Sequence, residues 1–367
     1  FGPLGFPWAN LAITQTKFLP LIQIIDITGS EGIGFWILSL NIILYIFIRT
    51  ISPSRNLILS LAIISLLPWV YGSARLNYFD NLENQETRFV SAMQPNINPN
   101  KKWDVSFRDR LYVIMDSLNI EAYSFKPDLV LWPESALPAY MRVSSLRNKY
   151  ELLVSDTGIP LLMGTVDYKY DLNKRLSFNG AIYFGINGIK IYHKNFLVPF
   201  AEYIPFSNKI PILKKLNFGQ ANFTQGSDFT TFPLDSIYFG NIICYESSHP
   251  NVARKFIQNG ARFLTIEAND AWLRNSSGVR QHFELARLRA VEQRVGIIRS
   301  ANTGISGIIE PSGRVQHKVT YGDQEVFKGN VFLNQRITFY GYYGNVFSKV
   351  CFILTLMLLL WFIKRQK

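Results

Sequence analysis

Two long uncharged apolar runs limit the folds that are open to this chain of 367 residues. Residues 32–48 contain no Asp, Glu, Lys or Arg, and neither do residues 56–74. Each run is close to the length of a helix that crosses the hydrocarbon core of a bilayer. Two buried core helices would also be apolar. The short basic loop between the runs, from Arg49 to Arg55, favours two membrane spans near 32–50 and 56–74.

The composition agrees with a membrane protein. Only 17% of the residues are charged and 48% are hydrophobic, whereas soluble proteins average about 25% charged residues. The net charge of +12 fits either nucleic-acid binding or anionic lipid. The chain has neither a Lys/Arg run interleaved with aromatic residues nor a zinc-finger spacing, so we expect a membrane and no nucleic acid as partner.

A third apolar segment, Val350 to Ile363, follows Lys349 and a group of aromatic residues at 339–343. It ends in the basic tail 364–367, which together with the Arg49–Arg55 loop belongs on the cytoplasmic side. The residues between the second and third spans then face the periplasm. Residues 1–31 have no predicted fold. Because the chain begins at Phe1 and has no signal-peptide pattern, we expect the C-terminal portion of a longer protein.

Residues 86–335 alternate between predicted strands and helices. Apolar strands are predicted over 128–132, 241–245 and 263–267, a hairpin across Asn187-Gly188, and a helix over 281–294. Alternation of this kind predicts an α/β sandwich. The expected organisation is a membrane segment over 1–85, a catalytic domain over 86–335, and a C-terminal span with a cytoplasmic tail over 336–367.

Three polar residues stand at the ends of these strands. Glu134 follows strand 128–132, Lys194 follows the hairpin, and Cys244 lies in strand 241–245. Catalytic groups collect at strand ends in α/β sheets. A carboxylate can take a thiol proton, and a fixed cation can stabilise the thiolate and an oxyanion. Taken singly, such a cysteine is more often a small buried residue, such a glutamate a helix cap and such a lysine a solvated charge.

Other patterns exclude several kinds of site. Cys351 is the only other cysteine, so no disulfide framework is expected. The four histidines lack a paired metal-ligand spacing, and there is no Gly-rich phosphate loop or Gly-x-Ser-x-Gly elbow. We therefore expect no metal and no cofactor. Arg287, Arg289 and Arg294 predict a solvated or ion-paired helix face.

The order of these motifs resembles the nitrilase, or carbon–nitrogen hydrolase, superfamily. The motifs are residues 131–135 around Glu134, residues 192–205 with Lys194 and Glu202, and residues 243–246 with Cys244. With its flanking apolar runs, the chain is similar to the apolipoprotein N-acyltransferase family over essentially its whole length. Further matching stretches are residues 5–8, 269–272, 281–283 and 299–304.

The resemblance implies an αββα sandwich on the periplasmic side, inserted before the last of eight spans, several of which this chain would lack. It implies that Cys244 is the nucleophile, Glu134 the general base and Lys194 the cation that stabilises the tetrahedral intermediate. It also implies supporting carboxylates and aromatic residues that handle substrate, namely Glu202, Glu246, Trp103, Tyr245 and Trp272. Leu273 stands where the family often has an aromatic residue, so the resemblance does not predict the shape of the acceptor pocket.

The implied reaction is a two-step acyl transfer in the bacterial inner membrane, by a multi-pass protein expected to be a monomer. An acyl chain passes from a phospholipid, typically phosphatidylethanolamine, to a thioester on Cys244. It then passes to the N-terminal amine of an S-diacylglyceryl-cysteine apolipoprotein, the last step of lipoprotein maturation. One alternative is a membrane-tethered amidase or nitrilase acting on a small C–N substrate. A third interpretation is a catalytically inactive, membrane-bound binding protein with this fold. The presence of Glu134, Lys194 and Cys244 together argues against it.

Overall fold

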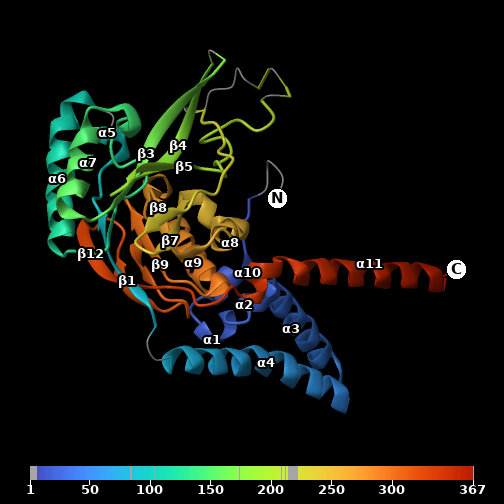
Figure 1. Cartoon of the computed structure of the whole chain (residues 1–367). Coiled ribbons are helices and arrows are strands. Elements are labelled where there is room, and N and C mark those ends of the chain that lie inside the picture. The colour runs from blue at the N-terminus through green and yellow to red at the C-terminus, as the bar shows by residue number, and fades with distance from the viewer. Residues whose placement is uncertain are drawn as a thin grey trace.

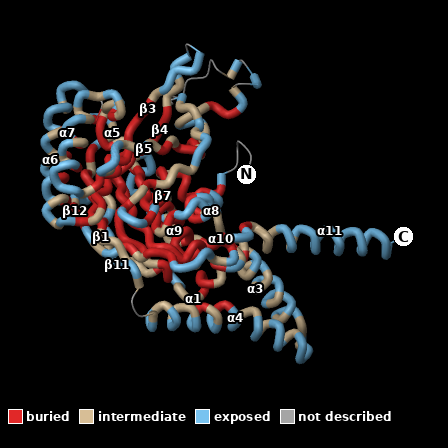
Figure 2. The backbone as a smooth tube through the Cα atoms, viewed as in Figure 1, coloured by how far each residue is buried: buried red, intermediate tan, exposed pale blue. Residues whose placement is uncertain are grey.

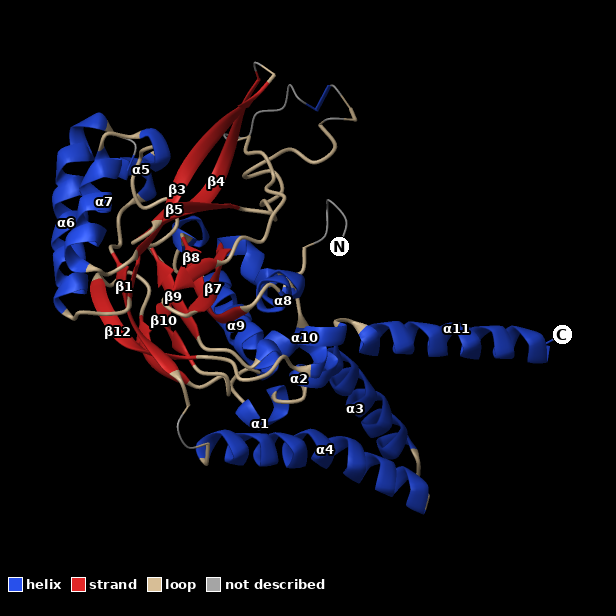
Figure 3. Cartoon of the chain, in the orientation of Figure 1, coloured by secondary structure: helices blue, strands red, loops and turns tan. Residues whose placement is uncertain are grey.

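The computed structural model describes residues 6–82, 85–102, 104–172, 174–207, 209–210, 212–213 and 222–366. Two six-stranded sheets face each other at its centre (Figures 1 and 3). In spatial order, the first sheet contains β12 (Glu325–Phe332), β1 (Thr87–Gln94), β2 (Leu129–Leu131), β3 (Leu161–Asp171), β4 (Lys174–Gly185) and β5 (Gly188–His193). The second contains β11 (Val315–Val319), β10 (Ser306–Ile309), β9 (Ile297–Ala301), β8 (Ala261–Ala268), β7 (Ile237–Ile243) and β6 (Phe232–Leu234).

Helices cover the outer face of each sheet. The first sheet packs against α6 (Arg108–Ser124) and α7 (Leu146–Thr157), and the second against α8 (Pro250–Gln258) and α9 (Ser277–Gln293). The central strands are parallel, β1 to β3 in one sheet and β7 to β9 in the other. Because both faces of these strands are covered, most of their residues are buried, and β2 is apolar and buried at all three positions. This is the α/β sandwich that the alternation predicts, in the αββα arrangement that the family resemblance implies.

Several elements differ from the prediction. The strand expected over 241–245 ends at Ile243, because Cys244 turns the backbone and begins a 3₁₀ helix, η5 (Cys244–Ser248). Strands β11 and β12 lie at sheet edges and carry polar residues, so they lack the apolar run of a buried strand. Of the three arginines expected to form a solvated or ion-paired helix face, Arg287 is partly buried and pairs with Glu284 at 3.0 Å. Arg289 and Arg294 are buried and form ion pairs with Glu292 and Asp26. Of the two predicted possibilities, a solvated face and an ion-paired face, the ion-paired one is confirmed.

Among the described residues, three helices are long and apolar enough to cross a membrane; in Figure 1 two of them lie below the sandwich and the third projects to its right. They are α3 (Glu31–Arg49), α4 (Arg55–Asp80) and α11 (Val346–Gln366). Most of their residues are exposed, as the pale blue in Figure 2 shows, although their side chains are apolar. A large exposed apolar surface is expected where lipid replaces water as the solvent. Helix α4 continues past the predicted span to Asp80.

The segment before α3 packs onto the sandwich. It forms η1 (Leu11–Gln15), α1 (Leu19–Ile22) and α2 (Ile25–Thr28), and its Ile22 and Ile25 share a small core with Leu288 of α9. The remaining short helices are α5 (Pro99–Lys102), α10 (Phe339–Tyr343), η2 (Val105–Phe107), η3 (Met141–Val143) and η6 (Asp270–Leu273). The membrane segment is therefore joined to the helix layer of the second sheet.

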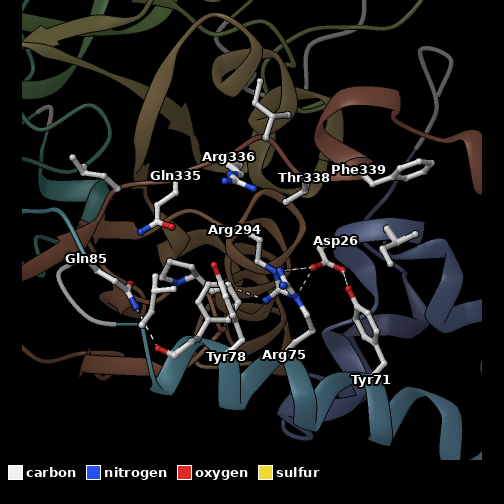
Figure 4. Close-up of a pocket in the computed structure, with 16 residues that line it drawn as sticks. Asp26, Tyr71, Arg75, Tyr78, Gln85, Arg294, Gln335, Arg336, Thr338 and Phe339 are labelled. Atoms are coloured by element: carbon white, nitrogen blue, oxygen red, sulfur yellow. Dashed lines mark hydrogen bonds and ion pairs between the residues drawn. The ribbon is translucent and has the colours of Figure 1, made fainter.

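An ion network completes this junction (Figure 4). Asp26 of α2 accepts hydrogen bonds from Arg294 Nε and Nη2 at 3.0 and 2.8 Å, and from Tyr71 of α4 at 2.8 Å. Arg75 of α4 lies 3.2 Å from the same carboxylate. The network borders a pocket of about 340 Å³. Since Asp26 and Arg294 are both buried, each needs the other to offset its desolvation.

Candidate active site

Cys244 occupies a strained turn at the carboxyl end of β7. Ile242 and Ile243 are fully buried, and the next residue, Cys244, has φ = 51° and is only partly buried. A left-handed φ is sterically disfavoured for a residue with a β-carbon, so the surrounding contacts must hold it. The Cys244 carbonyl oxygen accepts a hydrogen bond from Ser247 Oγ at 2.8 Å and lies 3.0 Å from His282 Nε2.

Lys194 meets two carboxylates directly after β5. Its side chain is 1% exposed, and its Nζ lies 2.9 Å from Glu202 Oε1 and 3.5 Å from Glu134 Oε1. The amide of Asn179, on β4, donates to these same two oxygens at 2.8 Å each. Glu134 follows β2 and packs against Gly164 of β3, where a β-carbon would lie 2.5 Å from the Glu134 Cα. The segment that follows β2 can approach β3 this closely only because residue 164 is glycine.

The charges of these groups affect one another. Burial would lower the pKa of Lys194, but Glu202, Glu134 and Cys244 outweigh burial, so the pKa is raised. The pKa of Cys244 is raised mainly by burial and then by Glu134, and Lys194 opposes this shift. The resting state therefore contains a protonated lysine and a neutral thiol. A thiol of this kind needs a base to become a nucleophile, and Glu134 is the carboxylate whose charge acts most strongly on it.

Glu246 connects the cysteine turn to the lysine loop. Its Oε1 accepts hydrogen bonds from Tyr192 Oη at 2.8 Å and from the backbone N–H groups of Asn195 and Phe196 at 2.7 and 3.2 Å. Its Oε2 accepts one from Ile243 N–H at 2.9 Å. Burial raises the pKa of Glu246 to about 7, although these donors favour the charged form. One carboxylate thus links the residue before Cys244 to the residues after Lys194.

A family model described as carbon–nitrogen hydrolase matches residues 89–335, and one described as the apolipoprotein N-acyltransferase N-terminal domain matches residues 1–43. The apolipoprotein N-acyltransferase of Geobacter metallireducens is 34% identical over 358 residues, covering 95% of this chain and 68% of that protein. The chain belongs to the apolipoprotein N-acyltransferase family. The Chlorobaculum tepidum member is 29% identical over 377 aligned residues, covering 94% of this chain and 70% of its own length.

A solved structure shares the fold of this N-acyltransferase family member. It is a mutant of the Nesterenkonia AN1 amidase from the nitrilase superfamily, 16% identical, with a TM-score of 0.50. The match covers 69% of this chain and 93% of the amidase. At this level of identity the likeness concerns the αββα architecture and not the substrate.

The aromatic residues expected to handle substrate differ in burial. Tyr245 is buried and borders a cavity of about 860 Å³, which Phe196 and Tyr203 also line and which carries Lys174 and Arg175. Trp272, on η6, is 74% exposed. Trp103 lies outside the described residues. In this N-acyltransferase family member the cavity beside Tyr245 therefore combines apolar walls with positive charge.

The sequence prediction missed four residues around Cys244, Lys194 and Glu134. Asn179 bridges the two carboxylates, and nothing in the sequence around it indicates that role. Lys102, the last residue of α5, is buried; burial lowers its pKa to about 8, and Glu134 opposes that shift. Asp270 and His282 lie in stretches that resemble the family, but the prediction assigns them no role. Charge and burial at these positions appear only when distant elements meet.

Cys244, Asp270 and His282 offer three possible metal-ligand atoms within 4.8 Å of one another. Hydrogen bonds already engage these groups. Asp270 Oδ1 lies 2.6 Å from His282 Nδ1, Asp270 Oδ2 accepts from Arg299 at 2.7 Å, and His282 Nε2 faces the Cys244 carbonyl. The donor set therefore suits a hydrogen-bond network better than a metal ion.

Proposed function

We propose that this chain transfers a fatty acyl chain from a phospholipid, through a thioester on Cys244, to the N-terminal amine of S-diacylglyceryl-cysteine apolipoproteins. This is the last step of bacterial lipoprotein maturation. Family membership supports the reaction class. The observation that carries the proposal is the joint position of Cys244, Lys194 and Glu134 in a chain with three apolar helices.

In the first step, Glu134 takes the thiol proton while Sγ attacks the ester carbonyl of the donor. Lys194 stabilises the oxyanion of the tetrahedral intermediate, because its ammonium group is held charged by Glu202 and Glu134. The carbon–oxygen bond of the ester then breaks, and Glu134 returns its proton to the leaving lysophospholipid. The products are a thioester on Cys244 and a lysophospholipid.

In the second step, the acceptor amine attacks the thioester carbonyl and Glu134 accepts a proton from the nitrogen. The carbon–sulfur bond breaks, the proton passes to sulfur, and the amide product leaves. Glu202 and Asn179 hold Lys194 and Glu134 in place through the contacts at 2.8 and 2.9 Å. Tyr245 and the cavity that it borders would receive the acyl donor, while the exposed Trp272 would contact substrate nearer the surface. Trp103 is a further proposed substrate contact.

The proposed arrangement places a multi-pass protein in the inner membrane, with residues 86–335 as its catalytic domain on the periplasmic side. The basic loop between α3 and α4 and the basic end of α11 would lie in the cytoplasm, as the positive-inside rule requires. Phosphatidylethanolamine is the proposed donor and the monomer is the proposed unit. Both substrates are anchored in lipid, which gives a reason for a site joined to membrane helices.

The test uses labelled phosphatidylethanolamine and the purified full chain. We expect mass spectrometry to find an acyl adduct on Cys244 that disappears in Cys244→Ala and persists in Cys351→Ala, which removes the only other cysteine. Adding a diacylated lipopeptide should give a triacylated product. Absence of the adduct from the wild type would refute the thioester. Turnover of small amides with no lipopeptide product would favour the membrane-tethered amidase instead.

A further inference from the structure

His282 lies directly behind the nucleophile, on α9, and is 1% exposed. Its Nε2 is 3.0 Å from the carbonyl oxygen of Cys244, and its Nδ1 is 2.6 Å from Oδ1 of Asp270. Arg299 Nη2 lies 2.7 Å from Asp270 Oδ2 and 3.0 Å from the same imidazole nitrogen. Three elements, α9, η6 and β9, thus meet behind the backbone of the cysteine turn.

The hydrogen bonds determine how many protons this imidazole carries. A backbone carbonyl can only accept a hydrogen bond, so Nε2 must donate to Cys244. Asp270 is a carboxylate. Burial acts to raise its pKa, but His282 and Arg299 outweigh burial, so the pKa is lowered. Nδ1, which lies 2.6 Å from that carboxylate, must therefore donate to it as well. An imidazole with hydrogens on both nitrogens is a cation.

We propose that His282, as an imidazolium, is a positioning residue for acyl transfer, because its hydrogen bond to the Cys244 carbonyl holds the nucleophile in its left-handed conformation. With Ser247 Oγ at 2.8 Å, it gives that carbonyl two donors, which fix the peptide unit after the strained residue. The imidazole also lies within 4.8 Å of Cys244 Sγ. The inference rests on the proposed function and adds a residue to it.

The membrane segment covers the same imidazole. The Trp8 and His282 ring centroids are 4.7 Å apart, and Trp8 Nε1 donates to Gln281 Oε1 at 3.0 Å. Phe6 stacks on Tyr245 at 5.9 Å. An aromatic face stabilises a neighbouring cation and shields it from water. The segment that leads toward the first apolar helix therefore contacts residues on both sides of the cysteine turn, and His282 connects it to the nucleophile.

The first test observes the carbonyl directly. Cysteine labelled with ¹³C at its carbonyl enters this chain at only two positions, and Cys351→Ser leaves Cys244 as the single label. In the full chain in detergent, we expect the labelled carbonyl to absorb at higher infrared frequency after His282→Phe, because a charged donor has been removed. His282→Gln, which retains a neutral donor, should fall between the two. An unchanged band in His282→Phe would overturn the proposed contact.

The second test measures thioester formation in a single turnover with phosphatidylethanolamine. We expect His282→Phe to lower the rate by about ten- to a hundredfold, the effect of losing one charge-assisted hydrogen bond, and His282→Gln to lower it less. His317→Gln is the matched control: His317 also pairs with a carboxylate, Glu325, at 2.8 Å, but lies on β11. Its rate should stay at the wild-type value.

Equal rates in wild type and His282→Phe would refute the positioning role. Melting temperatures of all variants show whether a loss of rate is a loss of folding; if His282→Phe does not fold, His282→Gln provides the comparison in both tests. A wild type that forms no thioester would refute the proposed function instead. The infrared measurement does not need turnover, so the two failures are distinguishable.

Discussion

Replacing Glu246 by glutamine changes one oxygen of the carboxylate that connects Cys244 to Lys194. The amide oxygen can keep the three donors on Oε1, from Tyr192, Asn195 and Phe196. The new NH₂ group then faces the N–H of Ile243, which loses its 2.9 Å acceptor. Loss of a hydrogen bond to a charged acceptor costs about 1.5–3 kcal/mol.

A second effect opposes this loss. Burial raises the pKa of Glu246 from 4.5 to about 7, so keeping it ionised at pH 8 costs about 3 kcal/mol, which a neutral glutamine avoids. The two effects nearly cancel in the free energy of unfolding. The broken bond, however, is the one that holds the residue before Cys244. We therefore expect a melting temperature close to that of the wild type and thioester formation slowed by about ten- to a hundredfold.

The assay is single-turnover thioester formation on the full chain, with a melting curve of each variant. Glu284→Gln is the control. Glu284 lies on α9 and forms a partly exposed ion pair with Arg287, away from the hydrogen bonds of Glu246. Below about pH 6 the wild-type Glu246 is itself protonated, so the ratio of the two rates should approach one. A wild-type rate for Glu246→Gln at pH 8 would refute the claim that this carboxylate holds the cysteine turn.

Three further predictions concern stability and the site. Asn179→Leu removes the donor shared by Glu134 and Glu202 and should slow thioester formation at least tenfold. Asp26→Asn leaves Arg294 buried without its carboxylate and should lower the free energy of unfolding by about 3–5 kcal/mol. His249→Phe should flatten the stability curve between pH 6.5 and 4, because burial lowers the pKa of His249 to about 4. As the pH falls, His249 of the unfolded chain binds a proton before His249 of the folded chain does. The free energy of unfolding of the wild type therefore falls by up to about 3 kcal/mol through this window.

The first two of these have a matched control. Asn119→Leu removes another buried amide, which accepts from Trp132 at 2.9 Å, and should cost stability without changing the rate. Asp80→Asn breaks an exposed pair with Arg314 and should cost about 0–1 kcal/mol in a denaturation series. For His249, melting curves from pH 4 to 7 that coincide for variant and wild type would contradict the assignment.

The sequence predicted well where one segment carries the whole signal. The runs 32–48 and 56–74 became α3 and α4, since apolar length needs no tertiary partner to be recognised. The buried strand before Glu134 was found for the same reason. Prediction failed where polar residues alternate with apolar ones at sheet edges, as in β12, whose position depends on pairing with β1 more than 200 residues away. It also failed at Cys244, where a strand was expected and the chain turns.

By itself, the sequence determined which segments are apolar enough for a membrane and which side chains could serve as nucleophile, base and cation. Only the tertiary structure decided how those side chains are held. Asn179, Glu246 and His282 act through hydrogen bonds that join residues 23 to 54 positions apart. Such bonds depend on alignment to about half an ångström, which the packing of two sheets and their helices provides and no local pattern encodes.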